Sequence, residues 1–61
     1  MDNDLVLNNR NIELEVFGWD VDEEIAFEIT SVDGSEGIYL PKHKVVELVN
    51  FLTEQLNRLK E

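Results

Sequence analysis

Residues 41 to 60 read PKHKVVELVNFLTEQLNRLK, and this stretch decides the fold because it is long and periodic enough to predict a helix. At 100° per residue, six apolar side chains fall within an arc of about 100°, which is the width of a core-facing stripe. These six are Val45, Leu48, Val49, Leu52, Leu56 and Leu59. A stripe of this kind needs a sheet to cover. Phe51 lies outside one edge of the arc and is a candidate dimer contact.

Upstream of the helix, apolar and polar residues alternate as they do in half-buried strands, most clearly over residues 11–19 and 25–30. The inward-facing set, which is the expected core, is Ile12, Leu14, Val16, Ile25, Phe27, Ile29, Ile38 and Leu40. The outward-facing set is Glu13, Glu15, Phe17, Trp19, Ala26, Glu28, Thr30 and Tyr39. The two alternating segments therefore match as an antiparallel pair.

The connections between these segments carry turn residues. Residues 20–24 form an acidic loop, and Asp33-Gly34 followed by residues 35–37 is expected to make the second reversal. Pro41 is expected at the first helical position, where its missing amide hydrogen costs nothing. The predicted fold is an α+β, β-β-β-α two-layer sandwich: a three- or four-stranded antiparallel β-meander with one C-terminal helix packed on one face.

The N-terminal segment leaves two alternatives open. Leu5-Val6-Leu7 is apolar enough for a short first strand, and the asparagine-rich residues 8–11 are suited to a turn. In the second alternative, residues 1–10 form a frayed arm. A further alternative has Phe17 and Trp19 packing on Leu5 and Leu7 as a small second core.

The length of 61 residues predicts one domain, 1–61, with a core small enough to leave stability marginal. The sequence contains no cysteine, so self-association, most simply a homodimer, is the expected supplement to that core. No apolar run has the length of a membrane span, and the N-terminus is acidic where a secretory signal is basic. We therefore expect a soluble, cytoplasmic protein, located in the host cell if it is phage-encoded.

The residues that enzymes use are scarce in this chain. His43 is the single histidine, and no Ser/His/Asp or Cys/His arrangement has a meaningful spacing. The acidic loop lacks the glycine and the distant glutamate of an EF-hand, so it predicts no dedicated metal site. The sequence thus predicts a non-enzymatic protein with no catalytic residues and no cofactor.

The outward face of the sheet is the main candidate for a binding site. Two aromatic rings among carboxylates indicate an interface, because exposed aromatic residues are enriched at binding hot spots. Fourteen acidic residues against five basic ones give a net charge of −9, which repels nucleic acid and membranes and attracts basic proteins. The expected partner is thus a protein with a basic surface. The predicted contact residues are Glu13, Glu15, Phe17, Trp19, Asp20, Asp22, Glu28 and Tyr39.

The carboxylates of this face suggest a specific mechanism. Side chains two apart along a strand are about 6.5 to 7 Å apart, close to the spacing of successive phosphates on a nucleic-acid strand. In size, acidity and lack of catalytic residues, the chain resembles the small inhibitors that bacteriophages make against host nucleic-acid enzymes or defence systems. The resemblance implies inhibition by charge mimicry.

Two other functions compete with this hypothesis. Lys42, His43 and Lys44 place basic side chains at a helix N-terminus, where free amides bind anions, and they predict a phosphate- or nucleotide-binding oligomer. The third reading is a purely structural assembly subunit, for which Phe51 and the helix edge would matter more than the sheet.

Overall fold

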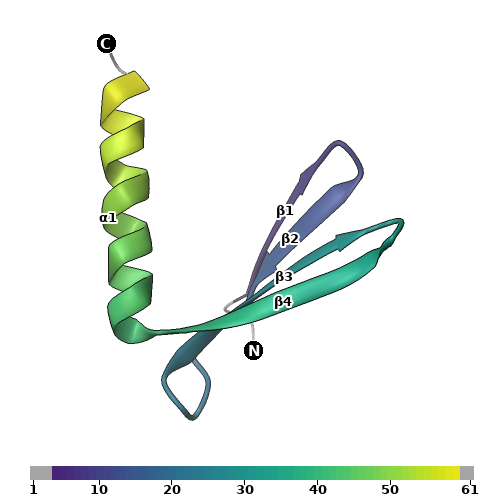
Figure 1. Cartoon of the computed structure of the whole chain (residues 1–61), viewed down its shortest axis with the longest axis horizontal. Coiled ribbons are helices and arrows are strands. Elements are labelled where there is room, and N and C mark those ends of the chain that lie inside the picture. Colours follow the sequence, from purple (N-terminus) through teal and green to yellow (C-terminus); the bar gives the residue numbers. More distant parts are fainter. Residues whose placement is uncertain (1–3, 60–61) are drawn as a thin grey trace.

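A computed structural model describes residues 4–59 of the chain. These residues form an antiparallel sheet followed by one helix (Figure 1). The elements are β1 (Leu5–Asn9), β2 (Ile12–Val16), β3 (Glu24–Ser31), β4 (Gly34–Pro41) and α1 (Lys42–Leu59). The strand order is β1-β2-β3-β4, so every strand pairs with its neighbour in the sequence. The predicted α+β meander with a C-terminal helix is confirmed, in its four-stranded form.

The N-terminal segment is a strand. β1 pairs with β2 along its whole length, from Leu5 opposite Val16 to Asn9 opposite Ile12. The two residues between the strands, Arg10 and Asn11, have φ values of 54° and 66°. Positive φ at both central residues is typical of a type I′ turn, whose twist matches that of the paired strands. The frayed-arm alternative is therefore wrong for residues 5–9, and residues 1–3 lie outside the described part.

The pairing of β2 with β3 follows the predicted alternation, with Leu14 opposite Ile29 and Val16 opposite Phe27. β2 ends at Val16, however, and not at Trp19 as the alternation predicted. One further ladder bond joins the Phe17 amide to a carbonyl of β3, and the chain then leaves the sheet. The alternation continues beyond the end of the strand, because a period-2 pattern of side chains does not indicate where backbone pairing stops.

The hairpin of β3 and β4 is longer than predicted. Its reversal needs only Val32 and Asp33, since Ser31 pairs directly with Gly34. The Ser31 hydroxyl accepts a hydrogen bond from the Asp33 amide at 3.2 Å, and Gly34 takes a φ of 129° that suits glycine. Residues 35–37, expected in the turn, belong to β4 and pair with β3. That expectation was wrong because two residues suffice to reverse the chain.

The helix begins one residue later than predicted. Pro41 is the last residue of β4, opposite Glu24, and α1 starts at Lys42. A proline is tolerated here because β4 is an edge strand and the missing amide leaves no ladder bond unmade. The expected extension of the helix to Lys60 lies outside the described residues.

The register divides the sheet into two faces. The inner face is mainly apolar and consists of Leu5, Leu7, Asn9, Ile12, Leu14, Val16, Ile25, Phe27, Ile29, Ser31, Gly34, Glu36, Ile38 and Leu40. It contains all eight predicted core residues. Leu5 and Leu7 lie on this face, whereas the alternation places Phe17 on the other, so the second core proposed for the N-terminal segment does not form.

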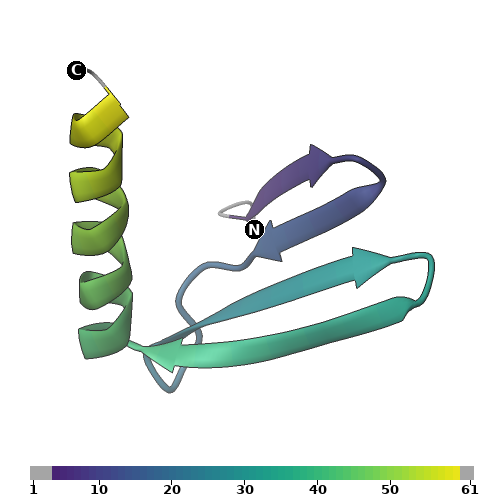
Figure 2. The same ribbon diagram turned by 45° about the horizontal axis from the view of Figure 1, so that its top comes forward.

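The helix contacts less of the sheet than the sequence predicted. α1 approaches only β3 and β4, and Figure 2 shows helix and sheet diverging from their junction. Among residues 4–59 no side chain is buried. The reason is the direct connection, since α1 follows β4 without a single linking residue and so contacts the sheet mainly near that junction. This helix is not long and apolar enough to cross a membrane.

Candidate functional site

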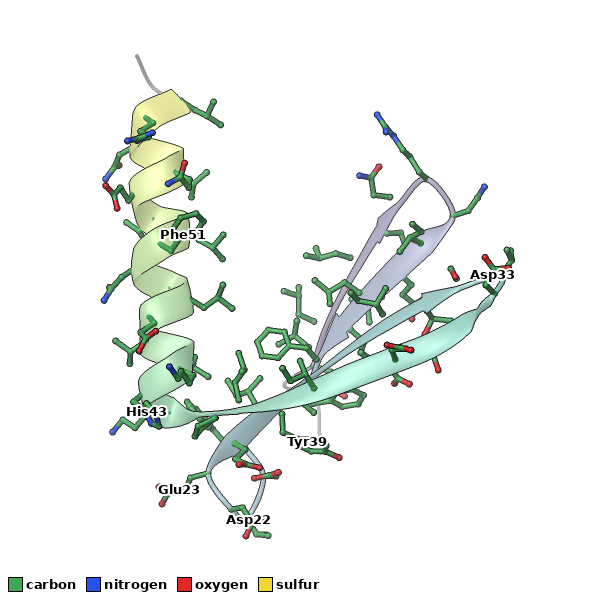
Figure 3. All side chains as sticks on the ribbon, in the orientation of Figure 1. Asp22, Glu23, Asp33, Tyr39, His43 and Phe51 are labelled. Carbon is green, nitrogen blue, oxygen red and sulfur yellow. The ribbon has the colours of Figure 1, made fainter. Side chains whose placement is uncertain are left out.

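The face of the sheet opposite the inner face is acidic. We call it the acidic face, and it consists of Val6, Asn8, Glu13, Glu15, Phe17, Glu24, Ala26, Glu28, Thr30, Ser35, Gly37, Tyr39 and Pro41. None of the four described strands contains a Lys, Arg or His. Figure 3 shows Tyr39 pointing away from the side on which the helix stands. The surface therefore combines carboxylates and aromatic rings with no cation on the same strands.

Two carboxylates of the acidic face oppose each other directly. Glu15 on β2 pairs with Glu28 on β3, which places their Cβ atoms about 4.5–5.5 Å apart. Glu13 is two residues away on the same strand, and all three glutamates are partly buried. Like charges directly across a strand pair are destabilising. The arrangement is thus a local concentration of negative charge that the sheet itself does not neutralise.

An aromatic row lies beside these glutamates. The Phe17 amide donates to the Ala26 carbonyl at 2.9 Å, and Ala26 lies opposite Tyr39, so a small residue separates two rings. Tyr39 is 63% exposed. Together with Glu28 and Gly37, these residues line a shallow hollow of about 290 Å³. The hollow offers an aromatic floor next to the carboxylates.

Gly37 keeps part of this hollow open, a role that the sequence pattern, which places residues 35–37 in a turn, does not predict. A Cβ at this position would lie 2.8 Å from the Phe27 carbonyl oxygen, closer than real Cβ atoms approach. A side chain at position 37 would therefore force the backbone of β3 or β4 to shift. Glu24 was also missed, although the period-2 pattern places it on the same face as Glu28 and opposite Pro41.

Trp19 does not lie in the aromatic row. It belongs to the loop between β2 and β3, where it is 54% exposed and lines a separate hollow of about 340 Å³ with Glu23 and Lys42. The structure thus brings Phe17 and Tyr39 together on the sheet and places Trp19 near the start of the helix. Because the strand ends at Val16, the predicted common face of Phe17 and Trp19 is interrupted.

The acidic loop is held by one of its own carboxylates. Asp20 Oδ1 accepts hydrogen bonds from the amides of Asp22 and Glu24, both at 2.9 Å. The Asp20 amide also donates to the Glu24 carbonyl at 3.0 Å, and Glu23 takes a φ of 61°. Asp20 therefore has a structural role in closing the loop. Asp22 and Glu23 remain at the loop tip, as Figure 3 shows.

The basic residues at the start of α1 are all exposed. Lys44 Nζ lies 3.5 Å from Glu47 Oε2, one turn along the same helix, so part of its charge is met there. His43 is at the beginning of the helix (Figure 3). Phe51, the candidate dimer contact, is 58% exposed on the helix. Within residues 4–59, no group of three or more potential metal ligands lies close enough together to hold an ion.

Fold and site together define a small α+β protein with an acidic, partly aromatic face on its sheet. No protein family model matches the chain, and comparisons with curated proteins and with solved structures find no match.

Proposed function

We propose that this protein is a non-enzymatic interaction module whose acidic face binds the basic surface of a partner protein. The observation that supports the proposal is the direct opposition of Glu15 and Glu28 on strands that carry no cation. A folded protein gains no stability from two such carboxylates. A partner that places a Lys or Arg side chain between them removes the repulsion and adds an attraction.

The neighbouring aromatic residues add apolar contact area, which a pair of charges alone does not provide. Phe17 and Tyr39 supply apolar contact area beside the glutamates, in a hollow that a partner side chain can enter. Aromatic residues of this kind act as anchors at interfaces, while the surrounding charges set partner choice and the association rate. The net charge of −9 draws a basic partner in from a distance at low salt.

The mechanism we propose is mimicry of a nucleic-acid backbone. Glu13 and Glu15 are two residues apart on β2, hence about 6.5–7 Å apart, and Glu28 adds a third carboxylate on the neighbouring strand β3. The preferred partner is then a nucleic-acid-binding protein whose binding surface the acidic face occupies. Inhibition of a nucleic-acid enzyme or a defence protein, as by phage-encoded inhibitors, is the outcome that this mechanism implies.

The test uses charge removal with a matched control. The immobilised protein captures basic nucleic-acid-binding proteins from a cell extract, and double-stranded DNA is used to elute them. The dissociation constant of the eluted partner is then measured for Glu15→Gln/Glu28→Gln and for Asp33→Asn/Glu54→Gln, which removes two charges elsewhere.

We expect the first double variant to bind at least about tenfold more weakly, a loss of about 1.4 kcal/mol, and the control to bind nearly as the parent does. Equal affinity of the two double variants would show that the acidic face is not the binding site. A partner that DNA fails to displace would remove the mimicry mechanism.

A further inference from the structure

Two apolar surfaces are left without a cover by residues 4–59. On the inner face, Ile29 is 53% exposed, although it lies at the centre of the sheet's pairing. Along the helical stripe, exposure rises away from the sheet to 64% at Leu56 and 83% at Leu59. An inner sheet face and a helical stripe of this composition are normally buried against each other.

We propose that a second copy of this chain covers both surfaces, with the helix of each copy lying on the inner face of the other. The proposal goes beyond the partner-binding function and uses different residues. Three further observations support it: the exposed area of the chain, the distribution of its charges and the match in length between helix and strand.

The exposed area is larger than a compact monomer has. The chain exposes 5406 Å², whereas a folded monomer of 7.1 kDa is expected to expose about 4,100 Å². Its radius of gyration is 13.3 Å, against about 10.5 Å for a compact chain of this length. The excess of about 1,300 Å² per copy amounts to about 2,600 Å² for two, which is the size of an obligate homodimer interface.

The distribution of charge favours the inner face as the surface on which two copies meet. With a net charge of −9 each, two copies repel one another over most of their surfaces. The inner face carries a single charged residue, Glu36, and its other polar residues also lie near the hairpin ends. An identical partner can therefore approach this face without opposing rows of carboxylates.

The dimensions of the two surfaces match. α1 has 18 residues and is about 27 Å long, and β3 has eight residues and is about 26 Å long. One identical copy covers a sheet and a helical stripe at the same time, whereas an unrelated helix would cover the sheet and leave α1 exposed. The exchange is reciprocal, as a twofold axis requires. Both acidic faces remain on the outside.

The first experiment is the molar mass of the parent protein by sedimentation equilibrium over a wide concentration range. We expect twice 7.1 kDa. The second is a mixture of ¹³C-labelled and unlabelled copies, in which nuclear Overhauser effects between chains are selected. They are expected between the methyl groups of Leu56 or Leu59 and those of inner-face residues such as Ile12 and Ile29.

A pair of variants separates the dimer from a monomer. Leu56→Asp is expected to weaken dimerisation at least tenfold, and Asn57→Asp, which adds the same charge outside the apolar stripe, is expected to leave it unchanged. A mass of 7.1 kDa at all concentrations would overturn the proposal. So would helix-to-sheet contacts found only within one chain, or contacts between chains confined to strand edges. None of these outcomes depends on binding of a basic partner.

Discussion

The opposed glutamates allow a quantitative test of the acidic face without knowledge of the partner. Replacing Glu15 or Glu28 by Gln keeps the size of the side chain and removes one charge of the pair. Because the two residues are directly opposite on neighbouring strands, their repulsion is expected to cost about 0.2–1 kcal/mol. Each single variant should therefore be more stable than the parent protein by about this amount.

The effect is large enough to measure in so short a chain. At about 2.1 cal/mol/K per residue, the unfolding entropy of 61 residues is about 130 cal/mol/K, so 0.5 kcal/mol raises Tm by about 4 °C. Unfolding is followed by circular dichroism at one fixed protein concentration, because self-association would make Tm depend on concentration. The measurement is repeated from low salt to 1 M salt, where screening should remove most of the gain.

The double variant Glu15→Gln/Glu28→Gln makes this prediction specific. If the stabilisation comes from the pair, the second substitution adds little to the first, because the repulsion has already been removed. Additive gains in the double variant would instead indicate relief of the general negative charge, and the reasoning from the strand register would be refuted. Asp33→Asn reports that general effect, since it removes a charge at the distant hairpin turn.

Three further substitutions test other features of the fold. Gly37→Ala should destabilise by about 1–3 kcal/mol in urea unfolding, because the new Cβ meets the Phe27 carbonyl; an unchanged midpoint would mean that the strand relaxes freely. Asp20→Ala should cost about 1 kcal/mol by losing the acceptor of two amides, and Asp20→Asn should recover part of it. Arg10→Asn should raise Tm by relieving up to about 1 kcal/mol of strain at a φ of 54°, and a fall in Tm would argue against the type I′ turn.

The two proposals place different demands on the two faces of the sheet. Removing the charge of Glu15 or Glu28 on the acidic face is expected to raise stability and lower partner affinity, a trade-off typical of residues kept for binding. Substitutions on the helical stripe are expected to lower stability and dimerisation together. The same pair of measurements, Tm and partner affinity, therefore shows which surface a given residue serves.

Local sequence determined much of this protein. The alternation around Leu14 and Ile29 predicted that the central strands pair, because pairing them places the apolar side chains of both on a common face, whereas a shift of one residue would turn one strand's set to the other face. The 3.6-residue period from Val45 to Leu59 predicted the helix, because it places the apolar side chains on one side of a helix. The candidate residues Glu13, Glu15, Glu28 and Tyr39 were placed on one face by this alternation, and the register confirms their arrangement.

Tertiary structure decided what periodicity does not encode. The alternation predicted Trp19 as a strand residue, but the strand ends at Val16. Asp20 was predicted as a surface residue of the acidic loop, but its carboxylate accepts two backbone hydrogen bonds that close this loop. The direct opposition of Glu15 and Glu28 follows from the pairing between two distant segments. The uncovered helical stripe likewise follows from the angle at which α1 leaves β4, which backbone geometry at one junction sets and side-chain patterning does not.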